Sequence, residues 1–366
     1  MKVLIIGTFP EPITGMSMAN YTLYRGLLEK KIEVDYIDTK LENSLTNKEK
    51  QGKFDCQKIV KVLKKMLKEI KRVIKNKDEI VCISVGTTFL GFLRYSHYML
   101  FSFLKGKKVF LHFHTSTFRR MYNNQNIVGK KILKFFLYNS KGLIVLGESL
   151  VSLFDDIVDK NKIYICENGV QNEIVATEEE IAKKREKLGN DTKKRVLYLS
   201  NLMKEKGILD LLKASEKFDD NEIEFNLAGE IEPNIKEEVE SYLKKYPKKI
   251  KYHGIVKGKE KKKLLLENYI FILPSYDEGQ PISILEAYAT GCSVITDELV
   301  GGIGDIFENC KNGLSVKSKN IDSICECIKD VKVEEYIKKN YELIEKKFSE
   351  KKFVERLLNI FLKGVE

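Results

Sequence analysis

Several patterns that would assign a chain of 366 residues to a common class are missing from this sequence. Its seven cysteines are scattered and none has the spacing of zinc ligands, which indicates free thiols in a reducing compartment. The apolar run at residues 2–7 is too short for a signal peptide and predicts a first strand. No G-x-G-x-x-G follows it, so the dinucleotide fingerprint is absent. Aromatic and basic residues are not interleaved as a stacking platform requires, which leaves a basic nucleic-acid-binding protein as a disfavoured alternative.

Positive charge is concentrated in the first half of the chain. Residues 1–170 contain 29 Lys and Arg against 16 Asp and Glu, whereas the remainder contains 35 against 37. A basic half beside a nearly neutral half predicts a polyanionic partner, either an anionic lipid surface or a nucleic acid.

The length and the apolar pattern predict an α/β protein of two domains. We expect a first domain at 1–170, a linker at 171–193, a second domain at 194–348 and a final helix at 349–366 that completes the first domain. The expected strands are 2–8, 33–37, 79–85, 109–114, 142–146 and 162–166 in the first half, and 195–200, 222–228, 251–254, 269–273 and a strand from 294 in the second.

Two segments of the first half each have two interpretations. Residues 58–77 carry nine Lys or Arg against one Glu around an apolar face. They predict a helix that either packs on the sheet with a solvated basic face or lies on a membrane surface. Residues 89–104 are strongly apolar but include Arg94 and His97, and they are short for a membrane span. They predict one buried or interfacial helix. A polar loop is expected at 38–55.

The most informative stretch is 271–296. An apolar strand ends there at a Pro-Ser pair, a turn contains Glu278 and Gly279, and Pro281 suits the first turn of a helix that runs to Thr290. This order places the loop at the carboxyl end of a parallel strand, where open α/β sheets bind ligands.

Two carboxylates flank the start of that helix. Free N–H groups near Ile282 and Ser283 would attract a phosphate. Glu278 precedes them and Glu286 follows them, and a carboxylate beside an anion site suits hydrogen bonding to sugar hydroxyls. A pair of solvated glutamates on a surface turn is the alternative interpretation.

The E-x7-E spacing inside EGQPISILEAYATG closely resembles the donor-site motif of family 4 of the retaining GT-B glycosyltransferases, the group 1 type. The resemblance implies that Glu278 contacts the transferred sugar and that Glu286 holds the nucleotide ribose. It also implies donor contacts at Gly279, Gln280, Pro281, Ile282 and Ser283.

The resemblance extends into the first half. Gly15, in the loop before an expected helix 18–30, matches a glycine that touches the donor diphosphate. His114, last in the strand 109–114, matches a catalytic histidine near the donor sugar. A histidine at a strand end is more often structural, and a zinc site would need further ligands nearby. The pair Asn168–Gly169 matches the crossing between the domains.

In the second half the resemblance covers four more donor contacts. Lys206 matches a lysine that clamps the diphosphate, whereas Asn201 stands where the family carries an arginine. Stabilisation of the leaving group would therefore depend more heavily on Lys206. Gly229 follows a strand, and Ile255 lies where the family packs its nucleobase.

As a whole, the resemblance implies a GT-B fold, an α/β architecture with two facing Rossmann-like domains and a cleft between them. The reaction would be sugar transfer with retention, from a UDP- or GDP-linked donor to a glycan or lipid-linked glycan of a bacterial surface polysaccharide. Glu278, His114 and Lys206 would be the catalytic residues. A GT-B sugar-nucleotide epimerase is the alternative.

Cofactors and location follow from the same resemblance. No cofactor is expected, and the lack of Asp-x-Asp predicts that no divalent metal binds. The basic first half predicts a cytoplasmic protein that lies peripherally on the inner face of the plasma membrane.

Overall fold

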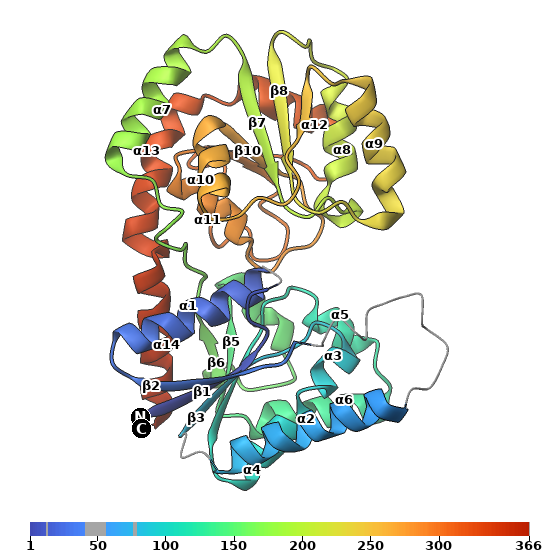
Figure 1. The fold of residues 1–366 in the computed structure, drawn as a ribbon, viewed down its shortest axis with the longest axis vertical. Helices are drawn as coiled ribbons and strands as arrows, with labels where there is room; N and C mark the ends of the chain where they lie inside the picture. Colours follow the sequence, from blue (N-terminus) through green and yellow to red (C-terminus); the bar gives the residue numbers. More distant parts are fainter. Residues whose placement is uncertain (12–13, 41–55, 76–78, 366) are drawn as a thin grey trace. The chain divides into compact units, whose positions relative to one another are not determined.

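A computed structural model describes residues 1–11, 14–40, 56–75 and 79–365, with side chains described outside 56–65 and 365. The expected polar loop lies outside the described residues from residue 41 on. The chain forms two compact units (Figure 1), the first from Met1–Cys166 with Phe353–Glu366 and the second from Glu167–Lys352. The segment expected as a linker, 171–193, lies in the second unit.

The first unit contains a parallel sheet with the strand order β2-β1-β3-β4-β5-β6. Its strands are β1 (Lys2–Gly7), β2 (Glu33–Asp38), β3 (Ile80–Ser84), β4 (Lys108–His112), β5 (Gly142–Val145) and β6 (Ile163–Ile165). The chain passes from β1 to β2 on one side and then returns to β3 on the other. The order therefore reverses between β1 and β3, which is where parallel sheets of this type bind ligands.

Helices cover both faces of this sheet (Figure 1). They are α1 (Gly15–Glu29), α2 (Cys56–Lys75), α3 (Phe89–Leu93), α4 (Ser96–Leu104), α5 (Phe118–Asn123), α6 (Ile127–Asn139) and α14 (Glu350–Val365), with 3₁₀ helices at Glu148–Phe154 and Lys160–Lys162. Alternate residues of β1 face opposite cores, because side chains alternate along a strand. Val3 and Ile5 pack with α1 and α14, whereas Leu4 and Ile6 pack with the core under α3 to α6.

The segment 89–104 forms two helices instead of the single helix expected. The break falls at Arg94 and Tyr95, where the Tyr95 side chain is buried and its hydroxyl lies 3.1 Å from the Thr39 hydroxyl. Phe92 and Met99 are fully buried on either side of the break. The segment is thus mainly core, although some of its side chains are exposed.

The second unit contains a parallel sheet with the order β12-β11-β10-β7-β8-β9. Its strands are β7 (Lys194–Leu199), β8 (Ile223–Ala228), β9 (Ile250–Tyr252), β10 (Ile270–Leu273), β11 (Ser293–Thr296) and β12 (Gly313–Ser315). The chain adds β8 and β9 on one side of β7 and then returns to place β10 on the other. The order reverses between β7 and β10.

Helices also cover both faces of the second sheet (Figure 1). One face carries α8 (Ile208–Ser215), α9 (Lys236–Lys245) and α12 (Ile321–Asp330), and the other carries α7 (Glu178–Asn190), α10 (Gly258–Glu267), α11 (Ile282–Ala289) and α13 (Val333–Leu343). The helix expected from Pro281 begins one residue later, with Pro281 as its N-cap. A 3₁₀ helix at Lys204–Lys206 precedes α8.

Candidate functional site

An ion pair lies at the point where the strand order of the second sheet reverses. Lys206 follows β7 and Glu278 follows the adjacent β10, and Lys206 Nζ lies 2.7 Å from Glu278 Oε1. Ser275 Oγ donates a hydrogen bond of 2.8 Å to the same carboxylate oxygen. Glu278 is buried, so the lysine and the hydroxyl stabilise a carboxylate that water reaches poorly.

The two loops that carry this pair are joined to each other. Tyr276 N donates to Glu205 O at 2.8 Å, and the Tyr276 hydroxyl donates to Asp210 of α8. Burial and the Asp210 carboxylate raise the pKa of Tyr276, so its hydroxyl stays a donor. Gly207 adopts a φ of 72°, and a Cβ there would lie 2.1 Å from Pro274 O. Only glycine permits this approach.

A second ion pair follows on α11. Glu286 is 6% exposed, and Lys261 of α10 donates to its Oε1. Glu278 and Glu286 therefore each engage a lysine through Oε1. In neither residue does Oε2 accept a hydrogen bond from any part of the chain that the structure describes. Each glutamate thus keeps one carboxylate oxygen available to a ligand hydroxyl.

The start of α11 lies between these two carboxylates. Among the described residues no side chain caps the helix, and Ile282 and Ser283 occupy its first two positions. Gln280 is held by Asn168 of the same unit: Asn168 N donates to Gln280 Oε1 at 2.6 Å, and Asn168 Nδ2 donates to Gln280 O at 3.0 Å. The uncapped N–H groups suit an anion.

The other predicted contacts of the second unit follow the same sheet edge. The Asn201 side chain is exposed after β7, and its backbone oxygen accepts a hydrogen bond from Tyr198. Gly229, after β8, adopts a φ of 141°, and a Cβ there would lie 1.9 Å from Ser200 O, so glycine is required on both grounds. Ile255 is exposed beyond β9. The structure thus brings Asn201, Gly229 and Ile255 to the edge that carries the two ion pairs.

Gly15 occupies the start of a helix and not the loop expected from the sequence. It is the first residue of α1, and Thr14 is the N-cap that accepts a hydrogen bond from Ser17 N. Gly15 is exposed. Its backbone N–H therefore lies at an exposed helix start, where an anion could bind beside the Thr14 cap.

A hydrogen-bond chain crosses the reversal point of the first sheet. Asn20 of α1 donates through Nδ2 to Thr8 O at 2.9 Å, and Ser84 Oγ at the end of β3 donates to Asn20 Oδ1 at 2.6 Å. Ser84 Oγ also lies 3.5 Å from His114 Nε2. His114 is thereby connected to residues that follow three neighbouring strands.

His114 lies two residues beyond the end of its strand, because β4 ends at His112 and not at His114 as expected. The two rings are 4.0 Å apart between centroids. Burial lowers the pKa of His114 to about 4 and, together with the neighbouring ring, lowers the pKa of His112. The His114 imidazole is therefore neutral at physiological pH.

Sequence reasoning missed Lys261, Ser275, Asn20 and Ser84. Lys261 belongs to a run of similar lysines, and the sequence alone does not show which of them points inward. Ser84 is the next-to-last residue of the predicted strand 79–85, so its position near the carboxyl end of that strand was a signal that could have found it.

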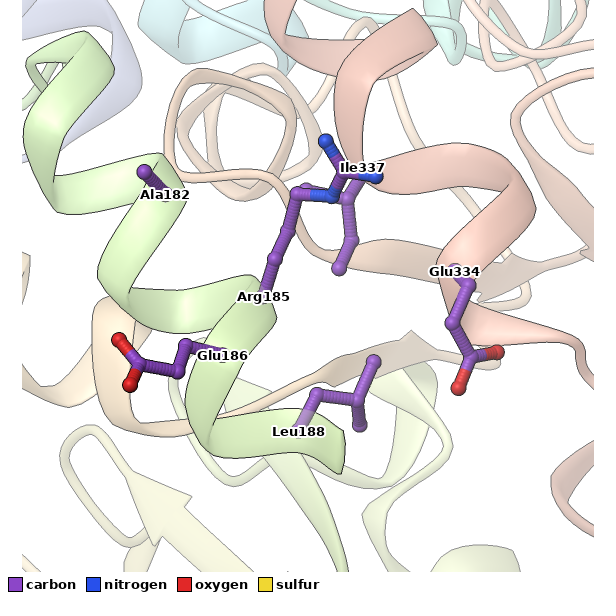
Figure 2. Close-up of a pocket in the computed structure, with 6 residues that line it drawn as sticks. All are labelled: Ala182, Arg185, Glu186, Leu188, Glu334 and Ile337. Carbon is purple, nitrogen blue, oxygen red and sulfur yellow. The ribbon is translucent and has the colours of Figure 1, made fainter. Parts of the chain in front are cut away.

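Figure 2 shows a pocket away from this edge, with a volume of about 390 Å³, between α7 and α13. It is lined by Ala182, Arg185, Glu186 and Leu188 of α7 and by Glu334 and Ile337 of α13. Arg185 extends across it toward Ile337. The pocket contains none of the predicted site residues.

Two further properties concern the described residues alone. None of their helices combines the length and apolarity needed to cross a membrane. They contain no group of three or more His, Cys, Asp or Glu that could hold a metal ion.

Two parallel sheets with reversed strand order, each covered by helices, define the GT-B class of fold. Residues 180–350 match the family model described as glycosyl transferases group 1, and the segment contains Lys206, Glu278 and Glu286. The match covers the part of the chain that forms most of the second unit. The motif resemblance found in the sequence is thereby confirmed at the level of the family.

The chain is similar to several curated proteins over part of their length. An uncharacterized glycosyltransferase of Methanocaldococcus jannaschii is 29% identical over 229 residues, which are 60% of this chain and 58% of that protein. The poly(ribitol-phosphate) alpha-N-acetylglucosaminyltransferase of Staphylococcus aureus is 27% identical over 179 residues, 46% of this chain and 36% of that protein. The matches therefore span less than two thirds of either relative.

Among solved structures, Anabaena HepE in complex with UDP is similar over 99% of this chain and 100% of that chain, with a TM-score of 0.73 and 13% identity. This likeness shows the shared GT-B fold.

Proposed function

We propose that the protein is a retaining glycosyltransferase that moves a sugar from a nucleotide sugar to a glycan or lipid-linked glycan. The observation that carries the proposal is the arrangement at the second sheet's reversal point. There an uncapped helix start lies between two buried glutamates, and each glutamate has one oxygen paired with lysine and the other open. The match of residues 180–350 to the model of group 1 glycosyl transferases supports the same conclusion.

Each part of a nucleotide sugar has a counterpart at this edge. The N–H groups of Ile282 and Ser283 suit the diphosphate, and Lys206 adds a positive charge beside them. Glu278 would accept hydrogen bonds from hydroxyls of the transferred sugar, and Glu286 from those of the ribose. Ile255 offers an exposed apolar side chain for the nucleobase. A UDP- or GDP-linked donor is proposed, and HepE, which shares the fold, binds UDP.

Transfer with retention would proceed on one face of the sugar. As the bond between the anomeric carbon and the diphosphate oxygen breaks, that oxygen accepts the proton of the acceptor hydroxyl, and the new glycosidic bond forms on the same side. Lys206 and the start of α11 would stabilise the negative charge that develops on the diphosphate, which is the main catalytic contribution in this scheme. The neutral His114 would donate a hydrogen bond to the sugar. The proposed reaction needs no resident cofactor or metal ion.

A thermal-shift panel of UDP-, GDP- and ADP-linked sugars tests the donor assignment. We expect at least one of them to raise the melting temperature, because a ligand that binds only the folded state stabilises it. Incubation of that donor with the enzyme alone, followed by analysis of its sugar, separates transfer from epimerisation. A changed sugar still attached to the nucleotide would identify an epimerase and overturn the proposal, and so would the absence of any shift.

The proposed location is the inner face of the bacterial plasma membrane, where a lipid-linked acceptor is presented. The Staphylococcus aureus relative is named for poly(ribitol-phosphate), a surface polymer, which supports an acceptor of this kind. The first unit also exposes an amphipathic surface that the sequence did not single out. We define the α6 surface as Ile127, Val128, Lys131, Lys134, Phe135 and Tyr138, all of which are exposed.

The α6 surface combines the two properties that interfacial binding needs. Its members recur at helical spacing along one side of α6, so they form a single face. Ile127 is 74% and Tyr138 is 67% exposed, and Lys162 lies over the Tyr138 ring. Apolar side chains among lysines suit the headgroup boundary of an anionic leaflet, to which each lysine adds about 1 kcal/mol. The α2 helix is less favourable, since its Arg72 already pairs with Asp35.

A further inference from the structure

We propose that Lys261 is a positioning residue that gives the donor site its preference for a ribose over a deoxyribose. This inference rests on the proposed function, because it assigns a role to a residue beside the candidate ribose-binding carboxylate. Neither the E-x7-E motif nor the other predicted contacts include Lys261.

The first step of the argument is the burial of the pair. Lys261 and Glu286 come from neighbouring helices, and their side chains are 15% and 7% exposed. A buried carboxylate without a cation is strongly destabilised, and Lys261 supplies the cation beside Glu286. An ionised carboxylate is a stronger acceptor for hydroxyls than a neutral acid.

The second step is that the two carboxylate oxygens of Glu286 have different surroundings. Lys261 Nζ donates to Oε1 of Glu286, and the structure describes no donor for Oε2. With Oε1 held, the carboxylate plane is fixed and Oε2 keeps its acceptor capacity. A ribose offers two adjacent hydroxyls, each a donor, whereas a 2′-deoxyribose offers one. A fixed acceptor distinguishes these sugars better than a mobile one, since it cannot rotate away to solvent.

The third step is the position of α10. This helix begins at Gly258, three residues after Ile255, which is the proposed nucleobase contact. Lys261 therefore lies in the first turn of α10, six residues after the nucleobase contact, and also contacts the proposed ribose carboxylate. The same helix therefore lies beside both proposed contacts, the one to the nucleobase and the one to the ribose.

The chain offers a matched control on the same helix. Lys262 is the next residue, its side chain is 19% exposed, and it pairs with Glu180 of α7 at 2.8 Å. Lys262→Met removes a lysine of equal size and similar burial from an ion pair on a different side of α10. Its effect on stability should resemble that of Lys261→Met, while its effect on nucleotide binding should be absent.

The test is calorimetric titration with UDP and 2′-deoxy-UDP, or with GDP and 2′-deoxy-GDP if only guanine nucleotides bind. We expect wild type to bind the ribonucleotide at least about tenfold more tightly than the deoxynucleotide, as the loss of one charged hydrogen bond requires. Lys261→Met should weaken ribonucleotide binding to nearly the level of the deoxynucleotide and leave the latter almost unchanged. Lys261→Arg should restore the preference, and Lys262→Met should retain it.

A double-mutant cycle with Glu286→Gln completes the experiment. If Lys261 acts through Glu286, Lys261→Met should have little further effect on ribonucleotide affinity in the Glu286→Gln background. Equal weakening of both nucleotides by Lys261→Met, or full additivity in the cycle, overturns the inference. A wild type that binds nucleotides without ribose preference also overturns it but leaves the proposed function standing. Failure of wild type to bind any of UDP, GDP and ADP refutes both.

Discussion

At the scale of single residues, Lys206 and Glu278 form an ion pair that water reaches poorly. Removal of one partner from such a pair leaves the other charge uncompensated, at a cost of roughly 3–5 kcal/mol. A substitution at either residue therefore changes stability as well as function. Each functional measurement on this pair needs a parallel measurement of unfolding.

Lys206→Ala should lower turnover more than it lowers donor affinity. In the proposed reaction negative charge on the diphosphate grows as its bond to the anomeric carbon breaks, so the lysine would stabilise the transition state more than the bound donor. We expect kcat to fall roughly 100-fold, the effect of losing one preorganised donor. Steady-state kinetics give the measurement, and Lys204→Ala, in the same 3₁₀ helix but exposed, is the control. A variant that keeps most of its kcat would assign this charge to another residue.

His114 should make the first unit less stable in acid. Its pKa of about 4 in the folded chain lies below the ordinary value of 6.5, so protons bind the unfolded chain preferentially. Stability should then fall as the pH decreases from about 6.5 to about 4. Urea denaturation at several pH values should show this fall in wild type and a smaller fall in His114→Asn. Equal slopes for both proteins would contradict the prediction.

At the scale of elements, both ends of α11 are suited to charged groups, an anion at its start and a lysine at its C-terminal end. Its start faces the candidate anion site, and its C-terminal end receives Lys184 of α7. Lys184 Nζ donates to Thr290 O at 2.8 Å, to Leu265 O at the end of α10 at 3.0 Å, and contacts Cys292 Sγ at 3.2 Å. Burial lowers the pKa of Lys184. One buried lysine thus satisfies carbonyl groups that two helix ends leave without intrahelical partners.

Lys184→Met should destabilise the second unit by roughly 1–3 kcal/mol, because it leaves those carbonyl oxygens buried without donors. Lys183→Met is the matched control, since Lys183 is adjacent, exposed and paired with Glu179 of the same helix. Chemical denaturation of the two variants gives the comparison. Equal stability of both would show that the buried hydrogen bonds of Lys184 contribute nothing net.

The sequence predicted the elements of the candidate site better than their contacts. The family resemblance assigned Glu278 and Lys206 to the same donor site, and the structure brings them together because each follows a strand and parallel strands end at a common edge. Lys261 was not predictable, because its inward direction depends on how α10 is rotated against α11. The break in 89–104 has no proline or glycine at Arg94 or Tyr95, and the glycine of this segment, Gly91, lies inside α3. The break depends on Tyr95 reaching Thr39, a residue far away in the sequence.

At the scale of the whole molecule, the main feature is the uneven distribution of charged residues along the chain. The excess of 29 basic over 16 acidic residues in 1–170 suits an anionic surface, and the α6 surface supplies apolar groups within that half. On the side of the first sheet that carries α6, α4 packs against α6 (Figure 1). Leu104, the last residue of α4, is exposed. Docking through this side would combine electrostatic attraction with shallow insertion.

Co-sedimentation with phosphatidylglycerol vesicles tests this docking. We expect binding that weakens as salt screens the attraction. Lys131→Glu with Lys134→Glu should abolish it, and Phe135→Ser should reduce it. The control is Lys351→Glu with Lys363→Glu, the same charge change on exposed positions of α14. Loss of binding with Lys68→Glu and Lys71→Glu instead would place the contact on α2, and no binding at low salt would refute docking.

The last helix has a consequence for the order of synthesis. Phe353, Leu357 and Phe361 of α14 are buried in the core of the first unit, where Val354 meets Gly26 and Gly364 meets Phe110. A ribosome makes these residues only after the entire second unit. The unit whose translation begins first therefore completes its core last, and the face of its sheet that α1 and α14 share stays partly uncovered while the second unit emerges. During that interval the exposed apolar surface of the first unit is prone to aggregation.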